Sequence, residues 1–294
     1  YYNTRVDKMW FTGGGTMRDE NNQELVADSM IYDCQRHYTK AIDNIQITDT
    51  SYKVILRGHY AEVWEKRGRS FATDGAYAIY YDGGDSLFIT ADTMFYRFKT
   101  EFNKEEKILG RRHVCFFKSD MQGRCDTMTF DMADSIIRMR VDPVLWTEDT
   151  QMTGDHIDIK TAHHALDSLF QRGNAYIISK DSIEGYNQIF GASMVSKFHE
   201  GNLNHVKVTG DAKVITWLRE DDGELIGINK SSAKNMRIEM SDKSISRIKY
   251  YQDIDETLYP EKDIKEKDRY LDGFLWREEE RPKDKNAVVG GLFI

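Results

Sequence analysis

Polar and apolar residues alternate strictly along several short runs of this chain. Residues 154–160 read GDHIDIK, residues 204–209 read NHVKVT and residues 236–240 read MRIEM, so that every second side chain is apolar. A period of two over roughly five to eight residues indicates a β-strand. One face of such a strand meets an apolar interior and the other face meets water.

Glycine-containing turn sequences separate these runs, for example at residues 172–174 (RGN), 209–211 (TGD) and 221–223 (DDG). Such residues tolerate positive φ. The segments between them are too short for helical crossovers, so we expect antiparallel hairpins and meanders. At residues 172–174 and 209–211 the sequence leaves open whether the chain forms a turn or only a kink.

A pattern of Asp-x-apolar-x-apolar recurs along the chain. It occurs at residues 28–32, 92–96, 126–130 and 155–159, and degenerate copies start at Ala192 and Lys234. A repeating unit of roughly 35 residues that carries strand pairs is typical of repeated β-architectures. We therefore predict an all-β protein built from repeated antiparallel strand pairs.

Charge and hydropathy exclude several classes of function. The net charge of −8 argues against nucleic acid, which is bound by basic faces, and against electrostatic docking on an anionic membrane. No apolar run approaches the roughly 18 residues that a membrane-spanning helix needs. Because the chain begins at Tyr1 rather than at Met, we expect a processed chain whose leader has been removed.

The sequence carries no signature of catalysis or of metal binding. Residues 12–16, TGGGT, lack the Lys-Ser/Thr that follows in a phosphate-binding loop. His163 and His164 would point to opposite faces of a strand, so both could not ligate one ion. No GxSxG, HExxH or Cys-His nucleophile pattern is present. We expect no catalytic residue, no metal and no cofactor.

Two of the three cysteines, Cys115 and Cys125, flank an expected turn at residues 119–123. If that hairpin is symmetric about position 120, the two cysteines lie opposite each other and a cross-strand disulfide is geometrically allowed. The alternative is a pair of half-buried thiols.

The alternation stops near the end of the chain. We expect one β domain over residues 1–255 and a C-terminal extension over residues 256–294. Pro260 can open a helix, and Ile264 and Leu271 could share one face of it. We expect this extension to be partly helical and docked on the sheet or on an edge strand, where it would prevent uncontrolled strand pairing.

The repeated units resemble those of the OstA-like, or LptA-like, lipopolysaccharide-transport family. The resemblance is carried by residues 154–179 (GDHIDIKTAHHALDSLFQRGNAYIIS) and 191–217 (GASMVSKFHEGNLNHVKVTGDAKVITW), and by DSLFITADTMFY at 85–96. Residues 125–135 are similar, and residues 258–282 resemble the end of long Bacteroidetes-type OstA-like proteins. The resemblance covers roughly residues 20–255 and, more weakly, the C-terminal extension.

The resemblance implies an open β-jellyroll, or "β-taco", whose apolar groove holds the acyl chains of lipid A during lipopolysaccharide transport. It implies a non-enzymatic protein in the periplasm, either free or associated with the outer membrane. It also implies partners of the same jellyroll fold in the transport bridge, or further copies of this chain, paired through edge strands.

The alternation predicts which side chains point inward, and the resemblance makes them groove candidates. They are Met128, Phe130, Ile157, Ile159, Met194, Phe198, Val206, Val208, Val214, Met236 and Ile238.

Two other functions stay open. A non-catalytic β-solenoid module that binds carbohydrate or protein would place Tyr and Trp on an exposed face. An enzyme on a β-scaffold would need a cleft with converging titratable groups, and the sequence names none.

Overall fold

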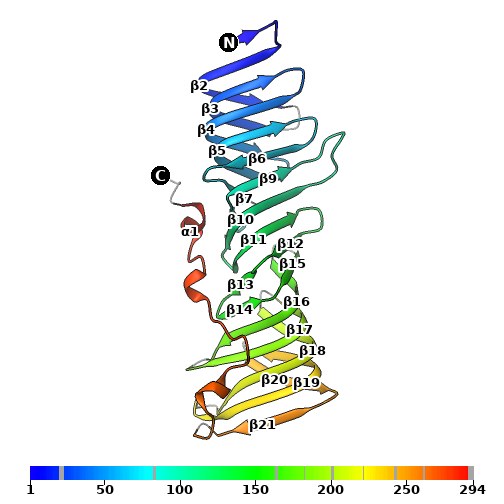
Figure 1. Ribbon diagram of the computed structural model, residues 1–294, viewed down its shortest axis with the longest axis vertical. Helices are drawn as coiled ribbons and strands as arrows, with labels where there is room; N and C mark the ends of the chain where they lie inside the picture. The colour runs from blue at the N-terminus through cyan, green and yellow to red at the C-terminus, as the bar shows by residue number, and fades with distance from the viewer. Residues whose placement is uncertain are drawn as a thin grey trace. The chain divides into compact units, whose positions relative to one another are not determined.

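The prediction of an all-β protein of repeated antiparallel strand pairs is confirmed by a computed structural model (Figure 1). The structure describes residues 1–19, 23–81, 84–162, 165–181, 183–199, 202–220, 222–241, 244–260 and 262–290. The chain forms two compact units. Unit 1 contains Tyr1–Ile137 and the segment that begins at Pro282, and unit 2 contains Arg138–Arg281.

Unit 1 is a series of antiparallel strands, most of which pair with the next strand in the chain. The strands are β1 (Tyr2–Asn3), β2 (Lys8–Arg18), β3 (Gln23–Asp33), β4 (Tyr38–Asp49), β5 (Val54–Trp64), β6 (Arg69–Thr73), β7 (Tyr77–Tyr80), β8 (Leu87–Thr90), β9 (Thr93–Arg97), β10 (Lys107–Lys118) and β11 (Met121–Asp131). β5 pairs with both β6 and β7, and β10 pairs with both β8 and β9. These two pairs of short strands therefore act as two long strands that are interrupted in the middle.

Unit 2 also consists of antiparallel strands, four of which are 14 to 18 residues long. The strands are β13 (Val144–Thr147), β14 (Thr150–Thr153), β15 (His156–Ala162), β16 (Ala165–Lys180), β17 (Tyr186–His199), β18 (Asn202–Arg219), β19 (Leu225–Ser241), β20 (Ser244–Tyr251) and β21 (Asp255–Tyr259). The boundary between the two units falls within β12 (Ile136–Arg140).

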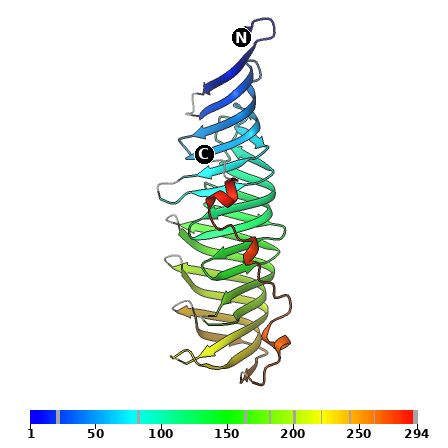
Figure 2. The ribbon, with the colours of Figure 1, turned by 90° about the vertical axis from the view of Figure 1, so that its left-hand side faces the viewer.

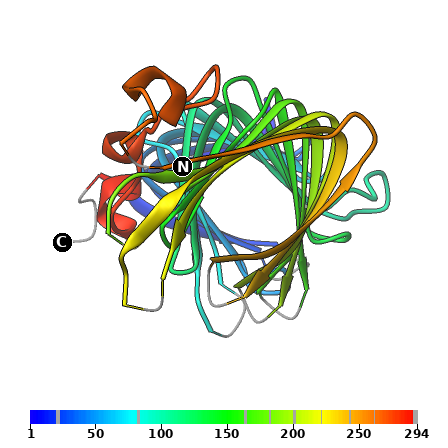
Figure 3. The ribbon, with the colours of Figure 1, turned by 90° about the horizontal axis from the view of Figure 1, so that it is seen from below.

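Bulges interrupt the long strands of unit 2 at corresponding places. The register shifts between Arg172 and Ala175 in β16 and between Thr209 and Ala212 in β18. At the first bulge Gly173 has a φ of 70°, a backbone conformation that glycine adopts without steric cost. A bulge bends its strand, and Figure 3 shows the strands of unit 2 bending so that they form two layers. The two sites that sequence left open as turn or kink are therefore kinks inside continuous strands.

The segment after β21 contains little regular structure. It has two 3-10 turns, η1 (Glu266–Arg269) and η2 (Glu278–Glu280), followed by one short helix, α1 (Lys285–Val289). Within unit 2, residues 262–281 lie on the outside of the strands (Figure 2). Within unit 1, the buried Val288 and Val289 of α1 pack against Tyr77 and Ile79 of β7.

Candidate functional site

The inner face of one layer in unit 2 carries two rows of directly opposed side chains. The first row runs Ile157, Gln171, Met194, Val208 and Met236 across β15 to β19. The second row runs Ile159, Leu169, Ser196, Val206 and Ile238 across the same strands. Seven of the eleven sequence candidates therefore share one face, because alternate residues of paired strands point to the same side.

The other layer of unit 2 carries a third row, which runs Leu145, Met152, Ile177, Ile189 and Val214. Val214 belongs to the candidates, whereas the other four were not selected from the sequence. Alternation does not show that Ile177 points inward, because residues 175–178 are apolar at every position. The candidate Phe198 lies opposite Leu203 near the end of β17.

The remaining two candidates lie in unit 1. Met128 of β11 is opposite Gly110, and Phe130 is opposite Ile108. Both are buried, Met128 completely and Phe130 with 5% of its surface exposed.

All eleven candidates are buried to the degree expected of a core. Their exposed fractions lie between 0% for residues such as Val208 and 9% for Phe198. Gln171 Oε1 and Ser196 Oγ, in the first two rows, have no hydrogen-bond partner among the described residues. The same holds for the Oγ of Ser231, which lies opposite Val214 and continues the third row on β19. An orphaned polar atom in an apolar interior costs about 1–3 kcal/mol, so this interior is less favourable than a purely apolar core.

The cross-strand disulfide that the sequence left open does not form, and Cys115 and Cys125 belong to no disulfide. Cys115 lies opposite Arg124, while Cys125 lies opposite Val114. The turn at Ser119 and Asp120 pairs Lys118 with Met121, so the hairpin is centred between residues 119 and 120 rather than on residue 120. This register differs by one residue from the symmetric one, which sends the two thiols to opposite faces of the sheet. Burial raises the pKa of the Cys115 thiol to about 11.

Metal ligation finds no support in the part of the chain that the structure describes. His163 and His164 lie outside the described residues. Among the residues that are described, no group of three or more His, Cys, Asp or Glu side chains could hold a metal ion. The same residues include no helix that is long and apolar enough to cross a membrane.

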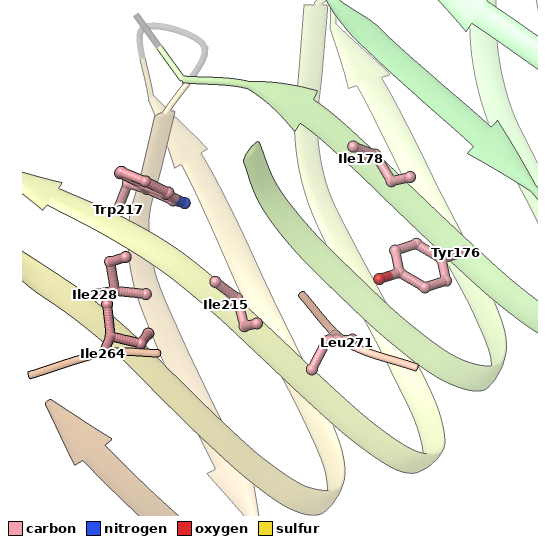
Figure 4. Close-up of a cluster of buried hydrophobic side chains, with 7 residues drawn as sticks. All are labelled: Tyr176, Ile178, Ile215, Trp217, Ile228, Ile264 and Leu271. Atoms are coloured by element: carbon pink, nitrogen blue, oxygen red, sulfur yellow. The ribbon is translucent and has the colours of Figure 1, made fainter. Parts of the chain in front are cut away.

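A hydrophobic cluster lies on the outer face of unit 2 (Figure 4), and of its members the sequence analysis named only Ile264 and Leu271. It joins strand residues to the C-terminal segment, and its members are Tyr176, Ile178, Ile215, Trp217, Ile228, Ile264 and Leu271. Ile215 and Ile228 are fully buried although they point away from the interior. The C-terminal segment therefore gives these strands a second buried face.

Two glutamines fasten the C-terminal segment to the strands of unit 2. Gln151 of β14 donates from Nε2 to the Leu275 carbonyl and accepts from the Arg277 backbone N–H, both at 2.7 Å. Gln188 of β17 likewise donates from Nε2 to the Arg269 carbonyl and accepts from the Leu271 backbone N–H. A polar residue that is fully buried needs such partners, but a sequence does not reveal that an outward-facing glutamine will be covered.

An arginine adds charge-assisted bonds at the same place. The Arg277 guanidinium donates two hydrogen bonds to Asp142, at 2.8 and 2.9 Å, and two to Glu280, at 2.7 and 2.8 Å. The bonds to Glu280 and to Asp142 raise the pKa of Arg277 above its ordinary value. The planar fork of arginine suits such bidentate pairing with carboxylates.

Comparison with known proteins gives matches only among solved structures. No protein-family model matches the sequence, and no curated protein is detectably similar to it. Solved structures that match include LptH from Pseudomonas aeruginosa, described as the LptA-homologous periplasmic component of the lipopolysaccharide transport device. The match has 16% sequence identity and a TM-score of 0.39, and covers 48% of this chain and 95% of that chain. At this level of similarity we base no argument on it.

Proposed function

We propose that this chain is a non-enzymatic periplasmic protein that binds lipopolysaccharide and carries its acyl chains between the two layers of unit 2. The observation that carries the proposal is the set of three inner rows, in which nearly every side chain is aliphatic. An acyl chain needs an apolar concavity and few polar groups. Rows that cross four or five strands offer such a surface over a length that suits an extended chain.

The interior has to open before it can hold an acyl chain, because its side chains are buried against one another. The two layers are joined where β16, β17 and β18 carry their bulges. Opening therefore takes place on the side away from the bulges, where hairpins end the strands. The orphaned Gln171 and Ser196 atoms favour opening, since a polar group of the cargo or water could then bond them.

We propose further that edge strands join this chain to partners of the same fold, or to copies of itself, during outer-membrane assembly. β20 and β21 pair with β19, and in the described part of the chain no strand pairs with their other side. Tyr251, Ile254 and Leu258, in or beside these strands, are 50–59% exposed. An open edge with exposed apolar side chains is a template for strand addition.

Photo-crosslinking tests the proposed cargo. A photoreactive amino acid would replace Ile159 or Val208 on the inner rows, or the exposed Lys207 as a matched control on β18. The purified protein would then be irradiated with lipopolysaccharide. We expect adducts at the two inner positions and none at Lys207. A folded protein that gives no adduct at either inner position, or equal adducts at all three, contradicts the proposal.

A further inference from the structure

The outer face of unit 1 carries a row of aromatic side chains that lies apart from the inner rows. The row consists of Tyr38, Trp64, Phe71 and Phe95, with Tyr60 beside Phe71. Consecutive ring centroids are 5.4, 5.9 and 5.9 Å apart along the row, and Tyr60 is 6.1 Å from Phe71. The row crosses β4, β5, β6 and β9, which are drawn side by side in Figure 1.

These rings point outward, because their neighbours along each strand point inward. Val63, Ser70, Ala72 and Met94 are buried by at least 93%, whereas the rings between them are only partly buried. The other half of this outer face is covered by α1, which packs on β7 and β8. Among the described residues no segment covers the aromatic row.

Two arginines contact the row, and one carboxylate lies within it, since Glu62 is opposite Phe71 and accepts a hydrogen bond from the Tyr60 hydroxyl. The Arg69 guanidinium lies 4.4 Å from the ring of Trp64, and that of Arg111 lies 5.3 Å from the ring of Phe95. Such contacts keep a guanidinium oriented over the ring. Arg97 pairs with Glu105, but neither Arg69 nor Arg111 has a carboxylate partner among the residues described.

The aromatic row and the arginines enclose a pocket of about 280 Å³. It is lined by Trp64, Arg69, Phe71, Phe95, Arg97, Leu109 and Arg111, with Ser70. This volume is close to the lower end of the range of about 300–1,000 Å³ that small-molecule pockets span, which suits one ring of a larger ligand. The pocket contains no acidic side chain, although the chain as a whole has a net charge of −8.

We propose that this outer face binds an oligosaccharide of acidic sugars that carry carboxylates. The C–H face of a sugar ring packs on the electron-rich face of an aromatic ring. A carboxylate matches the planar fork of arginine in a bidentate pair. A row of rings along successive strands suits a polymer of such units better than a single small anion. This site does not depend on the proposed lipid-binding interior.

Calorimetric titration of the whole chain with trigalacturonate tests the proposal, with the neutral maltotriose and the acidic peptide hexaglutamate as comparisons. We expect binding of trigalacturonate and weaker binding, by about tenfold or more, of the other two. Arg69→Gln and Arg111→Gln should each weaken trigalacturonate binding about tenfold, since each removes a charged hydrogen-bonding group. Arg111→Lys, which keeps the charge and loses the fork, should recover part of the affinity.

The matched control is Arg247→Gln, an exposed arginine of unit 2 that should leave binding unchanged, and circular dichroism confirms that each variant is folded. Equal binding of maltotriose would overturn the role of charge. Equal or tighter binding of hexaglutamate would show a peptide-binding cationic patch instead. The absence of trigalacturonate binding, or equal loss in Arg247→Gln, also overturns the proposal. None of these outcomes bears on crosslinking at Ile159 and Val208.

Discussion

The side-chain oxygen of Gln188 accepts a hydrogen bond of 2.8 Å from the backbone N–H of Leu271. The amide nitrogen of the same side chain donates to the carbonyl of Arg269 at 2.9 Å. One glutamine thus pairs with the C-terminal segment much as the backbone of a neighbouring strand would. The bond links residues that are far apart in the sequence and brings the segment onto the strands.

Replacement of Gln188 by leucine should therefore release the C-terminal segment. The Leu271 N–H and the Arg269 carbonyl would both lose a buried partner, at about 1–3 kcal/mol each. We expect the free energy of unfolding in urea to fall by about 2–6 kcal/mol. Hydrogen exchange at Leu271 should also accelerate. Gln46→Leu in unit 1, which does not contact the segment, should leave that exchange rate unchanged.

The hydrophobic cluster should be sensitive to truncation in a position-specific way. Leu271 is 6% exposed and Leu275 is 61% exposed, so the two leucines of one segment form a matched pair. Leu271→Ala should destabilise the protein by about 2–5 kcal/mol, because it leaves a cavity, whereas Leu275→Ala should cost less than about 0.5 kcal/mol. Similar unfolding midpoints for the two variants would show that the cluster does not form in solution.

The open edge of unit 2 should govern self-association or partner binding. Ile254 lies beside the edge strands and is 59% exposed, whereas Ile183 is 64% exposed in a loop elsewhere in unit 2. Ile254→Asp should reduce association in sedimentation experiments at least tenfold, since a charge opposes burial of the edge. Ile183→Asp should behave like the unmodified chain. Identical sedimentation of both variants would argue against edge pairing.

Stability should fall on acidification partly through His205. Burial first, and then the positive charges of Arg237 and Lys197, lower the pKa of His205 below the ordinary histidine value of 6.5, while the charge of Glu239 acts in the opposite direction. The unfolded chain therefore binds the proton more tightly. The stabilising contribution is complete above pH 6.5 and is lost as the pH falls through the folded-state pKa.

His205→Asn should lessen this loss. Thermal unfolding at pH 7.5 and at pH 5.5 should give a smaller drop in Tm for the variant than for the unmodified chain. The drop should be unchanged in Lys207→Gln, a neighbouring control on β18. An equal drop for all three proteins would mean that His205 titrates normally in the folded state.

Cys115 should react slowly with alkylating reagents. Its pKa of about 11 leaves roughly one thiolate in a thousand at pH 8. Iodoacetamide should therefore modify Cys115 at least about a hundredfold more slowly in the native protein than in urea, as followed by mass spectrometry. Mild oxidation should yield no Cys115–Cys125 crosslink, and recovery of that crosslinked peptide from native protein would contradict the register of β10 and β11.

The fold class could be predicted because alternation is a local property. Runs such as residues 154–160 already show which side chains share a face, and the rows through Val206 and Val208 follow from pairing such runs. The sequence shows that the alternation is interrupted at Gly173. Whether the chain turns there or only bends depends on how β16 pairs with its neighbouring strands. The disulfide that the sequence left open does not form, because the hairpin turns at two residues, Ser119 and Asp120, and its register is one residue away from the symmetric one.

The outward-facing features could not be predicted from alternation. Tyr176 and Ile178 are buried only because a segment about ninety residues later in the chain covers them. Gln151 and Gln188 belong to strands whose outer residues would ordinarily meet water. The aromatic row of unit 1 is built from Trp64, Phe71 and Phe95, which lie on three different strands and become neighbours only through the strand register.

Each of the strands β15 to β18 pairs with the strand that follows it in the chain. Such a ladder can assemble by successive addition, because every new strand finds its template already in place and closes only a short loop. Its length can change by whole strands without altering the contacts of those that remain, as in repeat proteins. Insertion or loss of a hairpin can therefore lengthen or shorten the interior in steps during evolution.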